Sequence, residues 1–202
     1  MVDDGAEKKR RPGRPRSARA DKAILRATVE ILAGEGYQAL TIEGIAERAG
    51  VGKTTIYRRF SSIEEILIRA FGEMDVGIEI PDTGDTRKDL ILLGQAFREK
   101  SVAAVMFPVM GQIVGTALTN PAVLDAFRTC LMYPRQAAIQ TILQRGVARG
   151  DVRPDIEIHL ISDLIPGGII FHKLFQLPPD AVLPDDYPER VLDTIWNGIK
   201  AR

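Results

Sequence analysis

Cysteine and histidine are scarce in this sequence of 202 residues. Cys130 is the only cysteine, and the two histidines are His159 and His172. A single cysteine excludes an internal disulfide, which suits a reducing cytoplasm. On one helix, two residues thirteen positions apart lie about 20 Å from each other, so the histidines cannot share one metal ion within a subunit. We therefore expect no disulfide, no metal site and no cofactor.

Long apolar runs and catalytic motifs are also missing. No apolar stretch reaches the ~18 residues of a membrane span, and the start, residues 1–4, is no secretory signal. The segment GVGKTT, 50–55, resembles the end of a phosphate-binding loop, but Glu47 stands where that motif requires its first glycine. No nucleophile lies beside a recognisable base. The sequence predicts neither a membrane protein nor an enzyme.

The formal net charge of zero conceals an uneven distribution. Residues 1–60 contain 13 Lys and Arg against 8 Asp and Glu, whereas residues 61–202 contain 14 against 19. A basic front end on an acidic body indicates that the front end binds a polyanion such as nucleic acid. Chance clustering on a solvated face is the alternative interpretation of the charge alone.

The stretch TIEGIAERAGVGKTTIYRRF, 41–60, predicts two short helices around a tight turn. Ile45, Ala46 and Ala49 form one apolar stripe, and Gly50 follows where a chain leaving a helix often needs a left-handed residue. Helical period then resumes from Lys53 to Phe60. This is the helix-turn-helix pattern, whose second helix enters the DNA major groove.

These residues closely resemble the TetR/AcrR family of bacterial transcriptional regulators. The resemblance extends from about Ala20 to Phe71, and its centre is the segment GVGKTTIYRRFSSIEEIL. It implies an all-α chain with a three-helix, helix-turn-helix DNA-binding domain at 19–64. The rest, 65–202, would be a helical domain for effector binding and dimerisation. Two positions depart from the family pattern: Gly52 replaces a small hydroxyl residue at the helix cap, and Ile63 replaces a phosphate-binding lysine.

The resemblance also implies which residues contact DNA. Lys53, Thr54 and Arg58 would approach base edges, while Thr55 and Tyr57 would contact phosphates. Outside this helix, Thr41 at the cap of the preceding helix and Arg48 near its end join the predicted DNA-binding set. Two alternatives remain open at this point: Tyr57 as a half-buried core aromatic, and Arg59 as an ion-pair partner rather than a DNA contact.

The first 18 residues predict a disordered basic arm. Its segment PGRPR resembles the core of an AT-hook, in which Arg14 and Arg16 would follow the minor groove of A·T-rich DNA. The alternative is a solubilising tail. An arm that binds DNA would also compensate for the phosphate contact that Ile63 cannot make.

Residues beyond 86 have helical period almost throughout, interrupted near Tyr133-Pro134 and by the proline-rich segment 176–186. The segment ARGDVRPD, 148–155, resembles the loop before the last two helices in one subfamily of these regulators. There the last two helices form the dimer. The dimer interface predicted on this basis comprises Pro166, Gly167, Ile170, Phe171, Leu192, Ile195 and Trp196.

Soft apolar side chains on the central helices form a candidate effector pocket, although each is more often ordinary core. The predicted pocket residues are Met106, Phe107, Met110, Phe127, Cys130 and Tyr133. Few charged residues lie on these helices, which favours an apolar or amphipathic small molecule. Cys130 itself is expected to be a packed small hydrophobe, with a redox sensor as the alternative.

Together these features predict a cytoplasmic, one-component transcriptional regulator, expected to be a repressor. A homodimer would bind double-stranded DNA at a near-palindromic operator, in the nucleoid, and a small-molecule ligand would release it. Two rivals come from other classes. One is an architectural protein that binds DNA without sequence preference, and the other is an enzyme with a vestigial DNA-binding unit.

Overall fold

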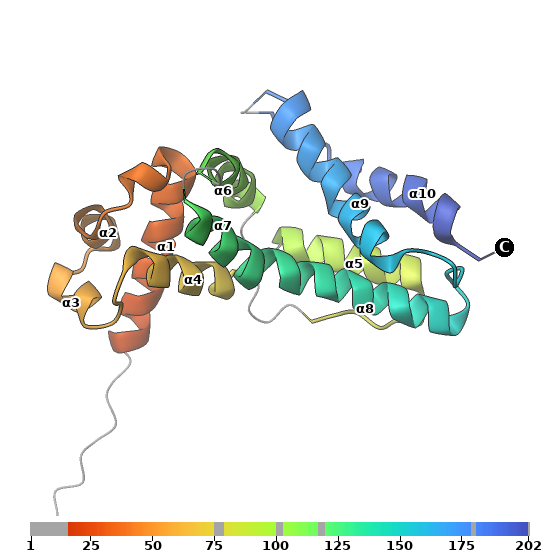
Figure 1. The fold of residues 1–202 in the computed structure, drawn as a ribbon, viewed down its shortest axis with the longest axis horizontal. Coiled ribbons are helices and arrows are strands. Elements are labelled where there is room, and N and C mark those ends of the chain that lie inside the picture. Colours follow the sequence, from red (N-terminus) through yellow and green to blue (C-terminus); the bar gives the residue numbers. More distant parts are fainter. Residues whose placement is uncertain (1–15, 75–78, 100–102, 117–119, 179–180, 202) are drawn as a thin grey trace, which may run out of the picture.

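The protein is described here by a computed structural model that covers residues 16–74, 79–99, 103–116, 120–178 and 181–201. Regular secondary structure in these ranges is helical, and an isolated antiparallel bridge joins Val152 to Lys200. The molecule is elongated, with α1–α3 at one end and α9 and α10 toward the other (Figure 1). The predicted all-α fold is confirmed.

The N-terminal end, here called the head, contains α1 (Arg16–Glu35), a 3-10 turn (Tyr37–Ala39), α2 (Ile42–Ala49) and α3 (Lys53–Tyr57). Two boundaries differ from the sequence prediction. Helix α1 includes residues 16–18, which we had assigned to the arm, because neither proline nor glycine interrupts the chain between positions 16 and 33. Helix α3 ends before Phe60, because the Ile56 carbonyl accepts hydrogen bonds from two amides, at 59 and 60.

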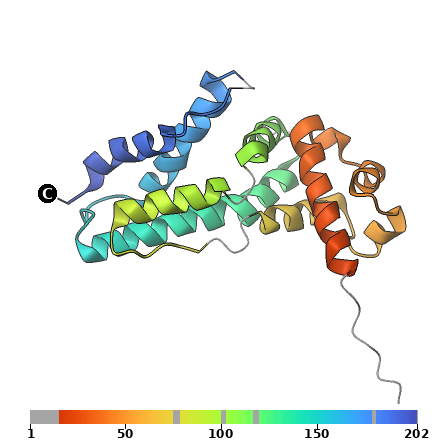
Figure 2. The same cartoon turned by 180° about the vertical axis from the view of Figure 1, so that it is seen from behind.

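The central part contains α4 (Ile63–Glu73), α5 (Thr86–Glu99), α6 (Ala103–Thr116), α7 (Pro121–Phe127) and α8 (Tyr133–Arg149). A π-helical turn, Arg128–Met132, joins α7 to α8 at the predicted interruption. Pro134 has no N–H to donate to the Cys130 carbonyl, so the preceding amide, that of Tyr133, bonds to the Arg128 carbonyl five residues back. Helices α5 and α8 lie side by side in both views (Figures 1 and 2).

The C-terminal pair is α9 (Ile158–Phe171), which continues into a π-helical turn (His172–Gln176), and α10 (Tyr187–Ile199). The rings of His172 and Tyr187 stack with centroids 4.4 Å apart and hold the two helices together near the connecting loop. The stretch Ile158–Gln176 has a mean hydropathy of 1.2 and is only 6% buried. By length and composition alone it could cross a membrane, which corrects the expectation that no segment would meet that test.

Two hydrophobic cores divide the molecule. The first, here called the head core, joins the head to α4, α6 and α7, and its buried members include Ile24, Ile31, Ile45, Ile56, Phe71, Val109 and Phe127. The second, the distal core, joins α5, α8, α9 and α10 through Leu93, Ile139, Ile142, Leu143 and Leu192. The π-helical turn lies where α7 of the head core passes into α8 of the distal core. The division between the two cores therefore differs from the domain boundary predicted between residues 64 and 65, because α4, α6 and α7 pack on the head.

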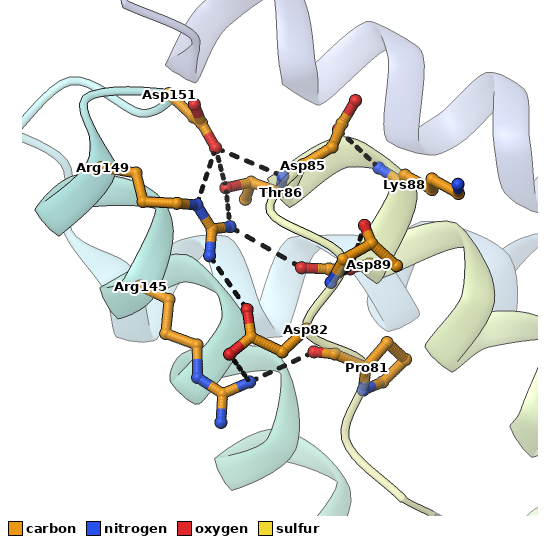
Figure 3. Close-up of polar contacts among 10 residues, drawn as sticks. Pro81, Asp82, Asp85, Thr86, Lys88, Asp89, Arg145, Arg149 and Asp151 are labelled. Carbon is orange, nitrogen blue, oxygen red and sulfur yellow. Dashed lines mark hydrogen bonds and ion pairs between the residues drawn. The ribbon is translucent and has the colours of Figure 1, made fainter.

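A polar cluster connects the start of α5 to the end of α8 (Figure 3). Arg149 forms ion pairs with Asp82, Asp151 and the fully buried Asp89, at 3.2, 3.2 and 3.6 Å. The Thr86 hydroxyl donates to Asp151 at 2.7 Å and accepts from Arg149 at 2.9 Å. Removing one member would leave a buried charge or hydroxyl unpaired, so the cluster favours a single register of α5 against α8.

Gly146 permits the close approach of α8 to the start of α5. A Cβ atom on this residue would lie 2.5 Å from Thr86 Oγ1 and 2.9 Å from Val152 Cγ2. We expect Gly146→Ala to lower the free energy of unfolding by about 1–3 kcal/mol through overpacking. Gly94→Ala is the matched control, because no atom lies within 4 Å of its added Cβ, and it should be neutral or stabilising by up to about 1 kcal/mol. Urea unfolding of both variants at one protein concentration tests this, and equal stabilities would contradict it.

Acid should weaken the same cluster through Asp151. The hydrogen bond from Thr86 and the nearby Arg149 lower the pKa of the Asp151 carboxyl. The unfolded chain therefore binds this proton at higher pH than the folded chain, and the stabilisation is lost as pH falls through the folded-state pKa. Urea unfolding between pH 7 and pH 3 should show a smaller loss of stability for Asp151→Asn than for the wild type. Asp155→Asn, an exposed control in the same loop, should follow the wild-type pH dependence.

Candidate nucleic-acid interface

The turn between α2 and α3 has the geometry that the sequence predicted. Gly50 adopts a left-handed conformation, with φ 65° and ψ 36°, and its amide donates to carbonyls of the last turn of α2. Val51 bonds back to the Ala46 carbonyl at 3.0 Å and packs against the head core. Ile45 and Ile56 are fully buried on the facing sides of the two helices. Burial of these faces turns the opposite side of α3 toward solvent.

The outer face of α3 carries the residues predicted to contact DNA. Lys53, Thr54, Tyr57 and Arg58 are exposed, and Thr55 is half-buried. Tyr57 is 63% exposed, which excludes the alternative of a core aromatic. No acidic residue belongs to α3, so its outer face offers hydrogen-bond donors without repelling phosphates. The start of α3 has no side-chain cap, because Gly52 occupies that position.

Three basic residues of the head are held by ion pairs that the sequence did not indicate. Lys53 binds Glu43 at 2.6 Å, Arg48 binds Glu35 at 2.7 Å, and Arg59 binds Asp21 at 2.5 Å. The Arg59 and Asp21 side chains are only 14% and 26% exposed, so this pair ties α1 to the end of α3. Of the two roles left open for Arg59, the structure supports the ion pair. Helix periodicity predicts on which face of a helix a basic residue lies, but it does not predict which acidic residue forms an ion pair with it.

Thr41 caps α2 through its hydroxyl, which accepts a hydrogen bond from the Gly44 amide at 3.0 Å. A Cβ at Gly44 would lie 3.1 Å from this hydroxyl, which accounts for a glycine within the helix. Ser62 caps α4 through the Glu65 amide, and Glu65 accepts in return from Ser61. Both caps hold the helices that flank α3.

Of the arm residues, Arg14 lies outside the described part of the chain. Arg16 is the first residue of α1, and its side chain lies outside the described part as well. The proposed minor-groove contacts of both therefore remain predictions.

The predicted pocket residues do not form one group. Met110 and Phe127 are buried in the head core, where Phe127 contacts Phe71 edge to face at 5.5 Å. Phe107 and Cys130 are half-buried, and the side chain of Met106 is not described. Tyr133 is 55% exposed, so we correct its assignment to an enclosed pocket. Burial, with Asp125 nearby, raises the pKa of the Cys130 thiol, which favours packing over redox reactivity.

The predicted dimer residues also separate. Gly167 and Phe171 are exposed on α9, whereas Pro166 and Ile170 are half-buried. Leu192 is buried in the distal core, and Ile195 and Trp196 pack against it, so the assignment of Leu192 to a dimer interface is wrong. The apolar face of α10 is directed into its own subunit. Four exposed apolar residues on α9 and its π-helical turn share one stripe: Leu160, Leu164, Phe171 and Phe175. Of these, the prediction contained Phe171 and omitted the other three.

Arg58 and Arg59 are adjacent in sequence but differ in surroundings. No ion pair of Arg58 occurs within the described ranges, whereas Arg59 is paired with Asp21. We expect Arg58→Ala to weaken binding to target DNA by roughly 5- to 150-fold, with little change in stability. Arg59→Ala should lower the free energy of unfolding by about 1–2 kcal/mol. Electrophoretic mobility shifts and urea unfolding of both variants check this. The prediction is contradicted if the two variants change DNA affinity and the free energy of unfolding by equal amounts.

Known proteins share both halves of this architecture. Residues 24–70 match the family of bacterial regulatory proteins called the tetR family, and residues 80–195 match the tetracyclin repressor-like C-terminal domain. The HTH-type transcriptional regulator YdeS of Bacillus subtilis is 28% identical over 190 residues, which are 94% of each chain. The DNA-binding transcriptional repressor TetR of Mycobacteroides abscessus is 29% identical over 91% of this chain and 93% of its own.

Two further similarities concern regulators of fatty acid metabolism. The fatty acid metabolism regulator protein of Bacillus subtilis is 44% identical over 157 residues, which are 72% of this chain and 77% of that protein. The structure of the fatty acid degradation regulator FadR from Bacillus halodurans has a TM-score of 0.76 and covers 95% of this chain and 100% of its own. At 18% identity it shows the shared fold. On this evidence the chain belongs to the TetR family of DNA-binding transcriptional regulators, which are not enzymes.

Proposed function

We propose that this regulator is a repressor that binds a near-palindromic operator as a homodimer and leaves it when a small molecule binds the body. The observation that carries the proposal is the separation of two surfaces. Helices α3 and α9 lie toward opposite ends of the molecule (Figures 1 and 2). Helix α3 exposes Thr54, Tyr57 and Arg58, and α9 carries the exposed apolar stripe. The relative from Mycobacteroides abscessus is named a transcriptional repressor, which supports repression rather than activation.

The apolar stripe of α9 supports the homodimer. Leu160, Leu164, Phe171 and Phe175 follow one another at intervals of four, seven and four residues, which places them on one side of the helix. A stripe of this kind exposed on an isolated subunit marks an interaction site. A second copy would bury it in a twofold, self-complementary contact.

The opposite side of α9 argues against a membrane span. Asp163 lies within the helix and accepts a hydrogen bond from Gln136 of α8, and Gln140 of the same helix lies within hydrogen-bonding distance of His159 and Ser162. Acidic side chains are costly at the centre of a lipid bilayer. A helix with one polar and one apolar side fits a contact between two soluble subunits better.

The head core offers a route from the body to DNA. Helices α6 and α7 pack on α1 and α4 through residues such as Val109, Phe127 and Phe71. Helix α1 in turn packs on α2, which contacts α3. A ligand that moves α6 or α7 would therefore change the orientation of the head. It can release DNA only through differential affinity for two states, typically about 1–3 kcal/mol of coupling.

We propose an amphipathic effector with a long apolar chain. The apolar side chains that α6, α7 and the π-helical turn contribute to the head core support this chemistry, with Met110, Phe127 and Cys130 among them. The relative that is 44% identical regulates fatty acid metabolism according to its name. In a titration of operator complexes, medium- and long-chain fatty acids should weaken binding by roughly 5- to 150-fold. Acetate is the control, and a series without any active acid would refute this effector class.

Footprinting on the DNA that flanks its own gene tests the operator. We expect protection of two half-sites separated by about one helical turn, 34–36 Å or a multiple of it. The rival, an architectural DNA-binding protein, predicts equal affinity for this DNA and for random DNA at physiological salt.

The homodimer has a separate test. Leu164→Glu places a charge in the apolar stripe and should convert the protein to a monomer, with loss of simultaneous half-site binding. Val182→Glu, a control at an exposed apolar residue outside the stripe, should leave the dimer intact. Analytical ultracentrifugation of both variants distinguishes them. If the Leu164→Glu protein is still a dimer, the interface lies on another surface.

A further inference from the structure

The ion pair between Glu43 and Lys53 lies at the start of the recognition helix. Glu43 is in the first turn of α2, and Lys53 is the first residue of α3, on the other side of the turn at Gly50. The carboxylate and ammonium groups are 2.6 Å apart and also form a hydrogen bond. The Lys53 side chain is therefore held toward α2 before any DNA is present.

Stability does not explain this pair. The two side chains are 53% and 60% exposed, and exposed ion pairs add little to folding stability. The acid also has a cost for binding, because it places a negative charge beside the face that meets DNA phosphates. An acid at this place is better explained by what it does to its partner.

We infer that Glu43 is a positioning residue for sequence discrimination, which restrains the Lys53 side chain beside α2 instead of leaving it free to bind any phosphate. This inference rests on the proposed operator binding. A lysine has a flexible four-carbon stem and a compact charge, so without a partner it can reach many phosphates in many conformations. A partner that limits these conformations reduces the entropy lost on specific binding and disfavours nonspecific contacts.

Glu43 acts on Lys53 directly. The hydrogen bond from Lys53 is the largest cause of the lowered pKa of the Glu43 carboxyl, so the carboxylate stays ionised throughout the physiological range. Thr41 holds the same turn of α2 by capping it, which limits the movement of Glu43 relative to the turn.

A charge-matched pair of variants tests the inference. Glu43→Gln and Glu47→Gln remove the same charge from the same helix, and Glu47 is exposed without an ion pair in the described part of the chain. Equilibrium binding to operator and to random DNA is measured over a range of salt concentrations. Glu47→Gln should strengthen binding to operator and binding to random DNA by the same factor, which leaves the ratio of the two affinities unchanged.

Glu43→Gln should lower the ratio of operator to random affinity by at least about fivefold, the lower limit for one good base contact. Its salt dependence on random DNA should steepen by about 0.9, which corresponds to one additional phosphate contact. In a Lys53→Met background, Glu43→Gln should have no further effect on the ratio, because it acts through the lysine.

Each other outcome overturns the inference. If Glu43→Gln matches Glu47→Gln, only the removed charge matters. If Glu43→Gln lowers the ratio equally in the Lys53→Met background, or lowers the melting temperature in parallel, Glu43 has a structural role instead. If the wild-type protein itself does not discriminate operator from random DNA, the proposed operator binding fails together with this inference.

Discussion

Apolar packing in the head core sets the direction of the recognition helix α3. Apolar residues of α1, α2, α3 and α4 share this core with α6 and α7, and the edge-to-face contact of Phe71 with Phe127 lies between the two groups. A recognition helix as short as α3 cannot keep its orientation by its own hydrogen bonds. Its direction depends on Ile56, which is fully buried in this core. Helices α6 and α7 therefore pack in the same core that orients the outer face of α3.

The distal core and the polar cluster around Arg149 complete the other half of the molecule. Gly146 permits α8 to approach the start of α5, and Arg149 then pairs with three acids, one of them the buried Asp89. This half is held by directional contacts that tolerate little sliding. The π-helical turn between α7 and α8 joins the two halves, and a turn of this kind, with its wider hydrogen-bond ring, is a natural place for a change in helix direction.

Charge on the head serves more than attraction to DNA. Three basic residues of the head, two of them predicted to contact DNA, are paired with acids in the same subunit: Arg59 with Asp21, Arg48 with Glu35 and Lys53 with Glu43. The first pair is largely shielded from solvent and connects two helices. The other two are exposed, so DNA phosphates can compete for the bases. The positive charge of the head is therefore partly organised by internal acids before binding.

Local sequence patterns were sufficient to predict the helices, the turn at Gly50, the cap at Thr41, and the interruption near Pro134. Each depends on residues within about five positions of one another, and helix periodicity, glycine conformation and proline chemistry act over that range. The family resemblance added the DNA-binding role. Contacts between distant residues required the folded chain: Leu192 faces its own subunit, Tyr133 faces solvent, and Glu43 selects Lys53. An amphipathic pattern shows that a helix has an apolar side, but only the packing of all helices decides which neighbour that side meets.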